Sequence, residues 1–376
     1  MVIDRNPIRG LLTRCSNRNH FNIIELIVSS VKMENFSWGV NFHGFACAIR
    51  QNRVATPKPP TEYINDSFNI FKQAGIRCIR FPVYWESYET NPEGFNQELD
   101  SISSLADKYN ISCIYDNHQW ECSSYFGRGI GFPNSLLKPS FGLDPPPTRN
   151  SSDQPSIQTL KEFWNRWWDR KLMTARGKDG WDAQLEFLEG VIKRVKDKNS
   201  TLGFEILNEP MVFRQADFRK VGIYHDYFIK NISVLTDKTL FFCFTSSDPL
   251  NAINFPWEQA KTKPSDNNVA NNVIIFDVHP YPSNSLTMGY YKMVSWMMKN
   301  ISMYAGEFNA GINPEVTINV RRFKGYVKTL KHFNVYGCAF WEWSYIPDRD
   351  HPAFNMTTIT NNKICANSNF KSFAFC

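Results

Sequence analysis

The sequence predicts a (β/α)₈ barrel, in which eight parallel strands close into a ring inside a layer of helices. Two observations carry this prediction. Eight short runs rich in β-branched and aromatic residues recur along the 376 residues, and segments with helical periodicity separate them. Near-continuous apolar strands alternating with amphipathic helices indicate a parallel sheet covered by helices. Eight such units favour a closed barrel over an open sheet.

The strands and helices are placed by the positions of their apolar residues. The expected strands are residues 36–41, 76–83, 111–117, 202–207, 240–245, 273–279, 301–306 and 335–341. The helical stretches with the clearest apolar stripe are residues 61–74, 96–109, 181–198 and 314–333. In the first of these helices Ile64, Phe68 and Phe71 share one face. Gly75 follows where a helix commonly ends in a left-handed residue.

One connection is too long for a simple barrel and predicts an insertion at about 119–180, between the third and fourth strands. It contains the proline-rich stretch KPSFGLDPPP, which predicts a loop, and then KEFWNRWWDRKLM, which predicts a helix. Trp164, Trp167 and Trp168 on that helix are expected to form a small core, although direct stacking on a sugar is the alternative. In either case the insertion should wall the catalytic face of the barrel.

Composition and charge rule out few classes of protein. Hydrophobic residues make up 42% of the chain and include 11 Trp, enough for a large core. Lys and Arg exceed Asp and Glu by 42 to 36, and residues 1–32 alone carry five basic against two acidic side chains. No basic stripe of the kind that nucleic-acid binders carry is recognised in the sequence, so no nucleic-acid partner is expected.

The N-terminal residues 1–32 are expected to be an arm or an uncertain signal-like segment ahead of a single catalytic domain at 33–376. The stretch at 21–31 resembles the apolar part of a signal peptide, but Asn22 and Glu25 interrupt it and no clear cleavage site follows. No apolar run is long enough to predict a transmembrane helix. An extracellular location is favoured only by the kind of substrate argued below.

The nine cysteines show no CxxC pair and no zinc-type spacing. Four of them fall inside apolar strand-like runs and are expected to be buried small hydrophobes: Cys78, Cys113, Cys243 and Cys338. Four others lie in loop-like or terminal segments, where disulfide pairing stays undetermined: Cys47, Cys122, Cys365 and Cys376.

Two strands end in a glutamate, which is the strongest chemical signal in the chain. The run GFEILNEP ends in Asn208-Glu209-Pro210, and MYAGEFNAG places Glu307 at the end of the seventh strand. A lone carboxylate after a strand is commonly just solvated. The ends of the fourth and seventh strands, however, face each other across a barrel, so the two carboxyl groups are expected to meet at its mouth.

Paired carboxyl groups are what the cleavage of a glycosidic bond requires. One must be protonated to protonate the departing oxygen, and the other must be ionised to attack the anomeric carbon or to activate water. Burial and charged neighbours have to separate their pKa values. Arg80, in the second strand, and Tyr281, just after the sixth, are candidates to hold Glu307 ionised.

Together these motifs resemble glycoside hydrolase family 5. The resemblance covers nearly the whole domain and rests on seven short motifs, each at an expected strand end: WGVNFHG, IRFPVYW, YDNHQ, LNEP, VHPYP, GEFNAG and FWEW. Any one motif is weak evidence. Seven such motifs in the same order as in the family are not expected by chance.

The resemblance implies a role for each matching residue. Glu209 matches the acid/base of the family and Glu307 its nucleophile. The expected supporting residues are Asn208 for the sugar 2-hydroxyl, Arg80 and Tyr281 for the nucleophile, His118 and His279 at the subsite of the attacked sugar, and Trp341 as the platform beneath that sugar. Trp120 and Glu121 match no fixed family pattern, which leaves the substrate open.

The sequence therefore predicts a monomeric, cellulase-like glycoside hydrolase that acts on an oligo- or polysaccharide, a β-glucan or mannan, by double displacement. The two carboxyl groups are expected to lie ~5–5.5 Å apart. No metal or cofactor is expected. Asp116, His118 and His279 are residue types that bind metals, but the sequence offers no further ligands to complete a metal site with them. Two alternatives remain, a glycolipid-directed glycosidase such as a glycosylceramidase and a carbohydrate-binding barrel without activity.

Overall fold

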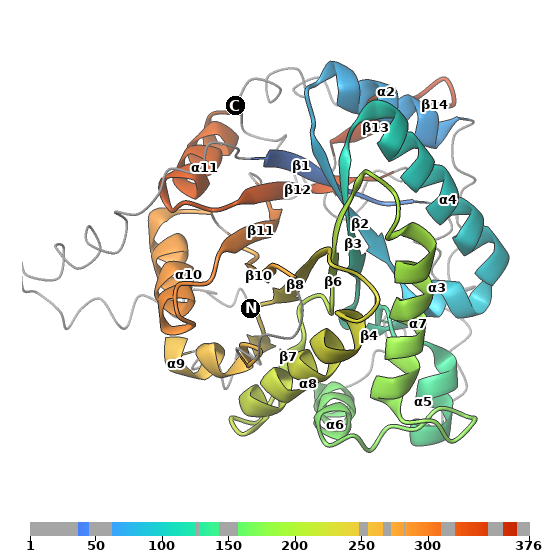
Figure 1. Ribbon diagram of the computed structural model, residues 1–376, viewed down its shortest axis with the longest axis vertical. Coiled ribbons are helices and arrows are strands. Elements are labelled where there is room, and N and C mark those ends of the chain that lie inside the picture. The colour runs from blue at the N-terminus through green and yellow to red at the C-terminus, as the bar shows by residue number, and fades with distance from the viewer. Residues whose placement is uncertain are drawn as a thin grey trace, which may run out of the picture.

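The computed structural model describes residues 37–44, 62–124, 128–142, 157–247, 255–265, 272–281, 283–309, 320–344 and 356–366. Within them, eight parallel strands close into a barrel in the order β1-β12-β11-β10-β8-β6-β3-β2, and helices surround it (Figure 1). The ring follows the chain, and the last strand pairs with the first, Ser37 opposite Gly337. The predicted (β/α)₈ barrel is confirmed.

Each barrel strand overlaps one of the eight predicted runs. The strands are β1 (Ser37–Phe42), β2 (Cys78–Val83), β3 (Ser112–Asn117), β6 (Thr201–Glu205), β8 (Thr239–Cys243), β10 (Ile274–Asp277), β11 (Met303–Phe308) and β12 (Gly337–Trp343). Every residue of β2 and β11 is buried, as expected for strands that face a packed barrel on one side and helices on the other. The boundary error that matters for the site is at β6, which ends at Glu205, so that Asn208 and Glu209 lie in the turn beyond it.

The four predicted helices are present, and two more occupy the segments after β6 and β10. They are α2 (Tyr63–Gln73), α4 (Pro92–Tyr109), α7 (Gly180–Val195), α8 (Asp217–Ile232), α10 (Ser285–Met297) and α11 (Val320–His332). Residues 314–319 of the last predicted helix lie outside the described residues. Gly75 does follow α2 in the left-handed region, with φ of 70°. The Asn91 side chain caps α4 by accepting from the Gly94 amide (3.0 Å), ahead of Pro92 in the first turn.

The predicted insertion leaves the barrel after β3 as β4 (Trp120–Ser123), β5 (Arg128–Ile130), α5 (Asn134–Phe141) and α6 (Ile157–Trp168). The loop predicted for the proline-rich stretch is wrong at its start, because residues 138–141 form the last turn of α5. Pro139 is tolerated there, and Gly142 ends the helix in a left-handed conformation. Residues 143–156 lie outside the described residues.

The tryptophans of α6 form the small core that the sequence favoured. Trp164 and Trp167 are fully buried, and Trp168 nearly so. The ring of Phe132 lies between them, with centroid distances of 5.7 Å to Trp164 and 4.9 Å to Trp167. These indoles therefore cannot stack on a sugar.

Shorter elements complete the described fold. They are α3 (Trp85–Thr90), α9 (Pro256–Gln259), the 3₁₀ turn η5 (Ala260–Thr262), the paired strands β7 (Met211–Val212) and β9 (Ser246–Ser247), and the hairpin β13 (Thr357–Thr360) and β14 (Lys363–Ala366). The hairpin packs beside α2 (Figure 1). None of the described helices is long and apolar enough to span a membrane.

The cysteines predicted to be buried in strands are buried: Cys78, Cys113, Cys243 and Cys338. Cys122, expected in a loop, lies in β4 and is also buried, because its side chain belongs to the main hydrophobic core. Cys365 is a free thiol at intermediate exposure, and Cys47 and Cys376 lie outside the described residues.

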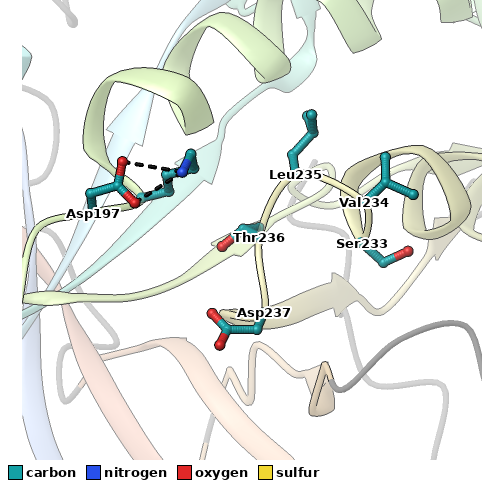
Figure 2. Close-up of a pocket in the computed structure, with 7 residues that line it drawn as sticks. Asp197, Ser233, Val234, Leu235, Thr236 and Asp237 are labelled. Carbon is teal, nitrogen blue, oxygen red and sulfur yellow. Dashed lines mark hydrogen bonds and ion pairs between the residues drawn. The ribbon is translucent and has the colours of Figure 1, made fainter.

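A cavity of about 340 Å³ opens at the amino-terminal end of the barrel, where Lys196 and Asp197 face the turn at 233–237 (Figure 2). The Lys196 ammonium lies 2.9 Å from the Asp197 carboxylate in this cavity. Barrel enzymes place their active sites at the opposite end, where the strands finish. The chemical groups described next lie at that carboxyl-terminal end.

Candidate active site

The two glutamates predicted to react meet at the carboxyl-terminal end of the barrel. Glu209 lies in the turn after β6, and Glu307 lies in β11. One carboxylate oxygen of each, together with a ring nitrogen of His279, lies within 4.8 Å of the others. Glu307 is buried and Glu209 is partly exposed, so Glu209 lies nearer to solvent.

Arg80 is the fully buried cation that holds this site together. Its guanidinium donates to the Glu307 carboxylate (3.2 Å), to Asn208 Oδ1 (2.7 Å) and to Asn41 Oδ1 (2.9 Å). One planar fork thus fixes both the expected nucleophile and the expected 2-hydroxyl ligand. The Asn41 amide group in turn donates to the Gly306 carbonyl (2.8 Å), which ties β1 to the strand that carries Glu307.

Three further acids surround Arg80 that the sequence reasoning did not assign. Glu205 accepts from the Arg80 Nε (2.8 Å), and the carboxylates of Asp116 and Asp277 lie 2.9 Å and 3.6 Å from the guanidinium. Asp277 also accepts from the Gly306 amide (2.6 Å), and a side chain at Gly306 would collide with that carboxylate. All three acids are fully buried, so their charges depend on Arg80 and on the neighbouring imidazoles.

Burial raises the pKa of Glu205 well above its ordinary value, against the opposing effect of Arg80, while Asp116 and Asp277 raise it further. Burial works in the same direction on Asp116, but Arg80 and His118 outweigh it and lower the pKa of that carboxyl group. Of these two carboxyl groups, Glu205 is therefore the harder to ionise.

His279 and Tyr281 contact the glutamate pair directly. His279 Nδ1 lies 2.6 Å from Glu209 Oε1 and 3.7 Å from Glu307 Oε2. The Tyr281 hydroxyl donates to Glu307 Oε2 (3.1 Å), as the sequence suggested. With Arg80 on the other oxygen, Glu307 receives hydrogen bonds at both of its oxygens.

The pKa values of the pair are separated, but in the order opposite to the one expected. Burial would raise the pKa of Glu209, yet the hydrogen bond and the charge of His279 outweigh it and lower that pKa. Burial raises the pKa of Glu307, and the nearby Glu209 adds to this effect, while His279 and Arg80 oppose it. For His279, burial is outweighed by the Cys243 sulfur, the Glu307 carboxylate and Asp277, so its pKa lies well above the ordinary value. The imidazole of His279 therefore holds a proton more tightly than Glu209 does.

The turn that carries Glu209 is strained and is held from one side. Glu209 has a φ of 37°, a conformation that is uncommon for a residue with a side chain. The Gln119 amide donates to the carbonyls of both Asn208 and Glu209 (2.8 Å each), and Asn208 donates back to the Gln119 carbonyl (2.9 Å). Gln119 was missed by the sequence reasoning, where it appeared only as the last letter of a motif.

Trp341 lies at the end of β12, where a platform was predicted. Its indole is partly exposed and stacks on His118 with a centroid distance of 5.4 Å and an angle of 15°. His43 meets the same indole edge-on at 4.9 Å. The His118 ring is oriented by Asp116, 2.5 Å from its Nδ1.

The family model for the cellulases, glycosyl hydrolase family 5, matches residues 39–346. The chain belongs to glycoside hydrolase family 5. The match includes every residue assigned to the site above.

Solved structures share the barrel of this family 5 chain at low identity. Endo-glycoceramidase II from Rhodococcus sp. is 14% identical with a TM-score of 0.64, over 90% of this chain and 78% of that one. An endogalactoceramidase is 14% identical with a TM-score of 0.67, over 90% and 80%. The endoglucanase Cel5A of Pseudomonas stutzeri is 16% identical with a TM-score of 0.55, over 90% and 92%. No curated protein matches the chain. At these identities the structures establish a shared fold, and the family match establishes a glycoside hydrolase.

Two groups of side chains in the described residues have spacing that would suit a metal. One is Glu209, Glu307 and His279 themselves, and the other is Glu205, Cys243 and His279. In the second group a metal would need the Cys243 thiolate, but burial raises the pKa of that thiol well above its ordinary value. The Nδ1 atom of His279 is also already engaged by Glu209. These residues fit a proton-sharing network better than a metal centre.

Proposed function

We propose that this family 5 hydrolase cleaves a β-linked glucan or mannan with retention of configuration, using Glu209 as acid/base and Glu307 as nucleophile. The observation that carries the proposal is the approach of one carboxylate oxygen of each to within 4.8 Å. Retaining glycosidases place the two groups ~5–5.5 Å apart, whereas inverting enzymes leave room for a water between them.

In the first step, Glu307 attacks the anomeric carbon while Glu209 gives its proton to the departing glycosidic oxygen. The bond from the anomeric carbon to that oxygen breaks, and an ester bond from the sugar to Glu307 forms. In the second step, Glu209 takes a proton from a water that attacks the same carbon, and the ester bond breaks. Inversion occurs twice, so the product keeps the configuration of the substrate.

His279 explains how Glu209 obtains its proton. His279 Nδ1 lies 2.6 Å from Glu209 Oε1, so a proton carried on this nitrogen reaches the carboxyl group along a single hydrogen bond. The donors of Arg80 and Tyr281 meanwhile favour the ionised form of Glu307. One short proton transfer from His279 thus brings Glu209 to the protonated form that the first step needs.

The other predicted residues support the sugar. Asn208 is held by Arg80 through its oxygen, which fixes its amide group for the 2-hydroxyl contact. Trp341, partly exposed and braced by His118 and His43, offers a flat apolar face to the sugar ring.

A glycolipid is the second candidate substrate. Two of the solved structures that share this barrel are named as glycoceramide- or galactoceramide-cleaving enzymes. The insertion after β3 also exposes Trp120, Ile157 and Met173, while the tryptophans of α6 are buried and unavailable to line a polysaccharide trench. These apolar side chains are the observation that favours this candidate.

The test is release of reducing sugar from β-glucans, mannans, xylans and a glycosylceramide by the wild-type protein and by Glu307→Ala. Activity on one substrate class, lost by several orders of magnitude in the variant, is expected, because the covalent route needs the nucleophile. Glu162→Ala, which removes a surface carboxylate of α6, is the matched control and should keep full activity. A folded Glu307→Ala variant with activity close to wild type would overturn the assignment.

A further inference from the structure

Helix α10 turns an apolar face toward solvent. Leu286, Met293 and Met297 recur on its outer side at the spacing of a helical stripe, and all three are exposed. Trp296, beside them, is 58% exposed, and Leu286 is 56% exposed. A single exposed apolar residue is ordinary, but a continuous apolar helix face marks an interaction surface.

The apolar surface continues onto α9. Trp257 is 49% exposed and stacks on Phe255 with a centroid distance of 4.2 Å. Helix α9 packs against α10, so the two exposed indoles, Trp257 and Trp296, belong to adjacent helices.

Helix α11, on the other side of α10, is strongly basic. Its thirteen residues include five Lys or Arg and no Asp or Glu, although the net charge of the whole chain is only +6. Arg321, Lys324, Lys328 and Lys331 are exposed. Within the described ranges, Arg321, Lys324 and Lys328 form no ion pair. The interpretation that the chain has no basic stripe is therefore wrong here, because the even spread of charge over the sequence conceals one acid-free helix.

Helices α10 and α11 lie side by side on one flank of the barrel, away from α2 and α4 (Figure 1). Helix α10 also lacks any Asp or Glu. We call the outer surfaces of α9, α10 and α11 the apolar–basic face. It combines exposed tryptophan, leucine and methionine with the exposed cations Arg321, Lys324 and Lys328.

We propose that the apolar–basic face binds an anionic lipid surface. Interfacial helices insert Trp, Leu and Met among the lipid headgroups while neighbouring Lys and Arg contact anionic phosphates. A nucleic acid would satisfy the cations but would leave Leu286 and Met293 in water. A second copy joined by a two-fold axis would bring one α11 close to the other and oppose cations to cations.

The face also adjoins the mouth of the active site. Helix α10 begins directly after the segment that carries Tyr281, whose hydroxyl reaches Glu307. Binding through this face would therefore hold the barrel mouth at the edge of the lipid layer. The proposal concerns where the protein resides and does not depend on which bond the site cleaves.

The experiment is co-sedimentation of the full chain with vesicles of phosphatidylcholine alone and of phosphatidylcholine with phosphatidylserine. Binding is expected only to the vesicles with phosphatidylserine and should weaken as salt is added. Each cation near an anionic surface strengthens partition about fivefold, so Lys324→Gln with Lys328→Gln should weaken binding about 25-fold. Trp296→Ala should also weaken it, since the indole inserts among the headgroups.

The matched control is Lys72→Gln with Lys108→Gln, which removes two exposed lysines from α2 and α4 on the opposite flank. This control should bind like the wild-type protein. Equal binding to both kinds of vesicle, or equal loss in the control, would overturn the proposal. Weakening by the α11 changes with no effect of Trp296→Ala would show a purely electrostatic contact and would overturn insertion of the indole. A dimer that is seen by analytical ultracentrifugation without vesicles and is dissolved by Trp296→Ala would overturn the proposal in favour of a second copy. All these readouts are independent of glycosidase activity, so their failure leaves the proposed chemistry untouched.

Discussion

At the scale of single residues, the site depends on where a few protons reside. Arg80 is the permanent cation, and four acids compete for it: Glu205, Asp116, Asp277 and Glu307. Because one guanidinium cannot neutralise four buried carboxylates, the pKa of Glu205 rises through burial, and the acidic surroundings raise the pKa of His279. The chemistry of Glu209 then follows from its contact with His279.

The charge on His279 is open to direct measurement. Its pKa is expected to lie well above the ordinary ~6.5, because the acidic surroundings outweigh burial. His225 is an internal control, because burial lowers its pKa to about 4. An NMR titration of the imidazoles should show His279 protonated and His225 neutral near pH 7, with His279→Gln identifying the signal. A His279 signal that titrates at or below the ordinary value would contradict the proton-sharing arrangement.

At the scale of elements, α3 and the insertion are joined by a buried acid. Glu86 lies in the first turn of α3 and accepts hydrogen bonds from the Ser124 amide (3.1 Å) and hydroxyl (3.0 Å) of the β4 segment. Burial nevertheless raises its pKa to about 7, which these hydrogen bonds only partly offset. Burial therefore makes the ionised carboxylate costly in the folded state, although the hydrogen bonds themselves favour that form.

This predicts a pH-dependent stability. With a folded pKa of about 7 against an ordinary value of 4.5, the folded state binds the proton more tightly than the unfolded state. The contribution of Glu86 is complete below the unfolded value and is lost as pH rises through the folded one, a change of about 3 kcal/mol. Denaturant unfolding between about pH 5 and about pH 8 should show this loss in the wild type and a smaller loss in Glu86→Gln. Identical pH dependence in the two proteins would contradict this account.

The small core of α6 makes a second prediction at this scale. Trp164 is fully buried against Phe132 and donates to the Glu121 carbonyl (2.9 Å). Trp164→Ala should lower the free energy of unfolding by about 3–5 kcal/mol. Trp120→Ala, which removes an exposed indole of the same insertion, should change it by less than about 1 kcal/mol. Similar losses in the two variants would mean that the core does not stabilise the insertion.

The sequence predicted the barrel well because its signals repeat eight times, but it located individual residues less well. Glu205 and Asp277 were missed because all of β6 beyond Leu202 and nearly all of β10 are buried, so no alternation separates inward from outward side chains. Gln119 acts through the backbone of a distant turn, which no local motif announces. The reversed pKa order of the glutamates depends on the position of His279, and only the three-dimensional arrangement supplies that.

At the scale of the whole molecule, the two ends of the barrel and one flank carry different kinds of surface. The carboxyl-terminal end gathers the acids, imidazoles and Trp341, while the amino-terminal end has the cavity between the turns after α7 and α8 (Figure 2). The apolar–basic face runs along one side and meets the mouth at the start of α10. A barrel with its site at one end can carry such a surface on its flank without disturbing the catalytic geometry.

The central claim is that Glu209 and Glu307 act by double displacement. Its most direct test is proton NMR of the first sugar released from whichever β-linked substrate is cleaved, recorded before the product mutarotates. The short distance between the two carboxylates predicts that the β-anomer appears first and the α-anomer grows in later. Initial release of the α-anomer would require a single displacement by water and would contradict the assignment of Glu307 as nucleophile.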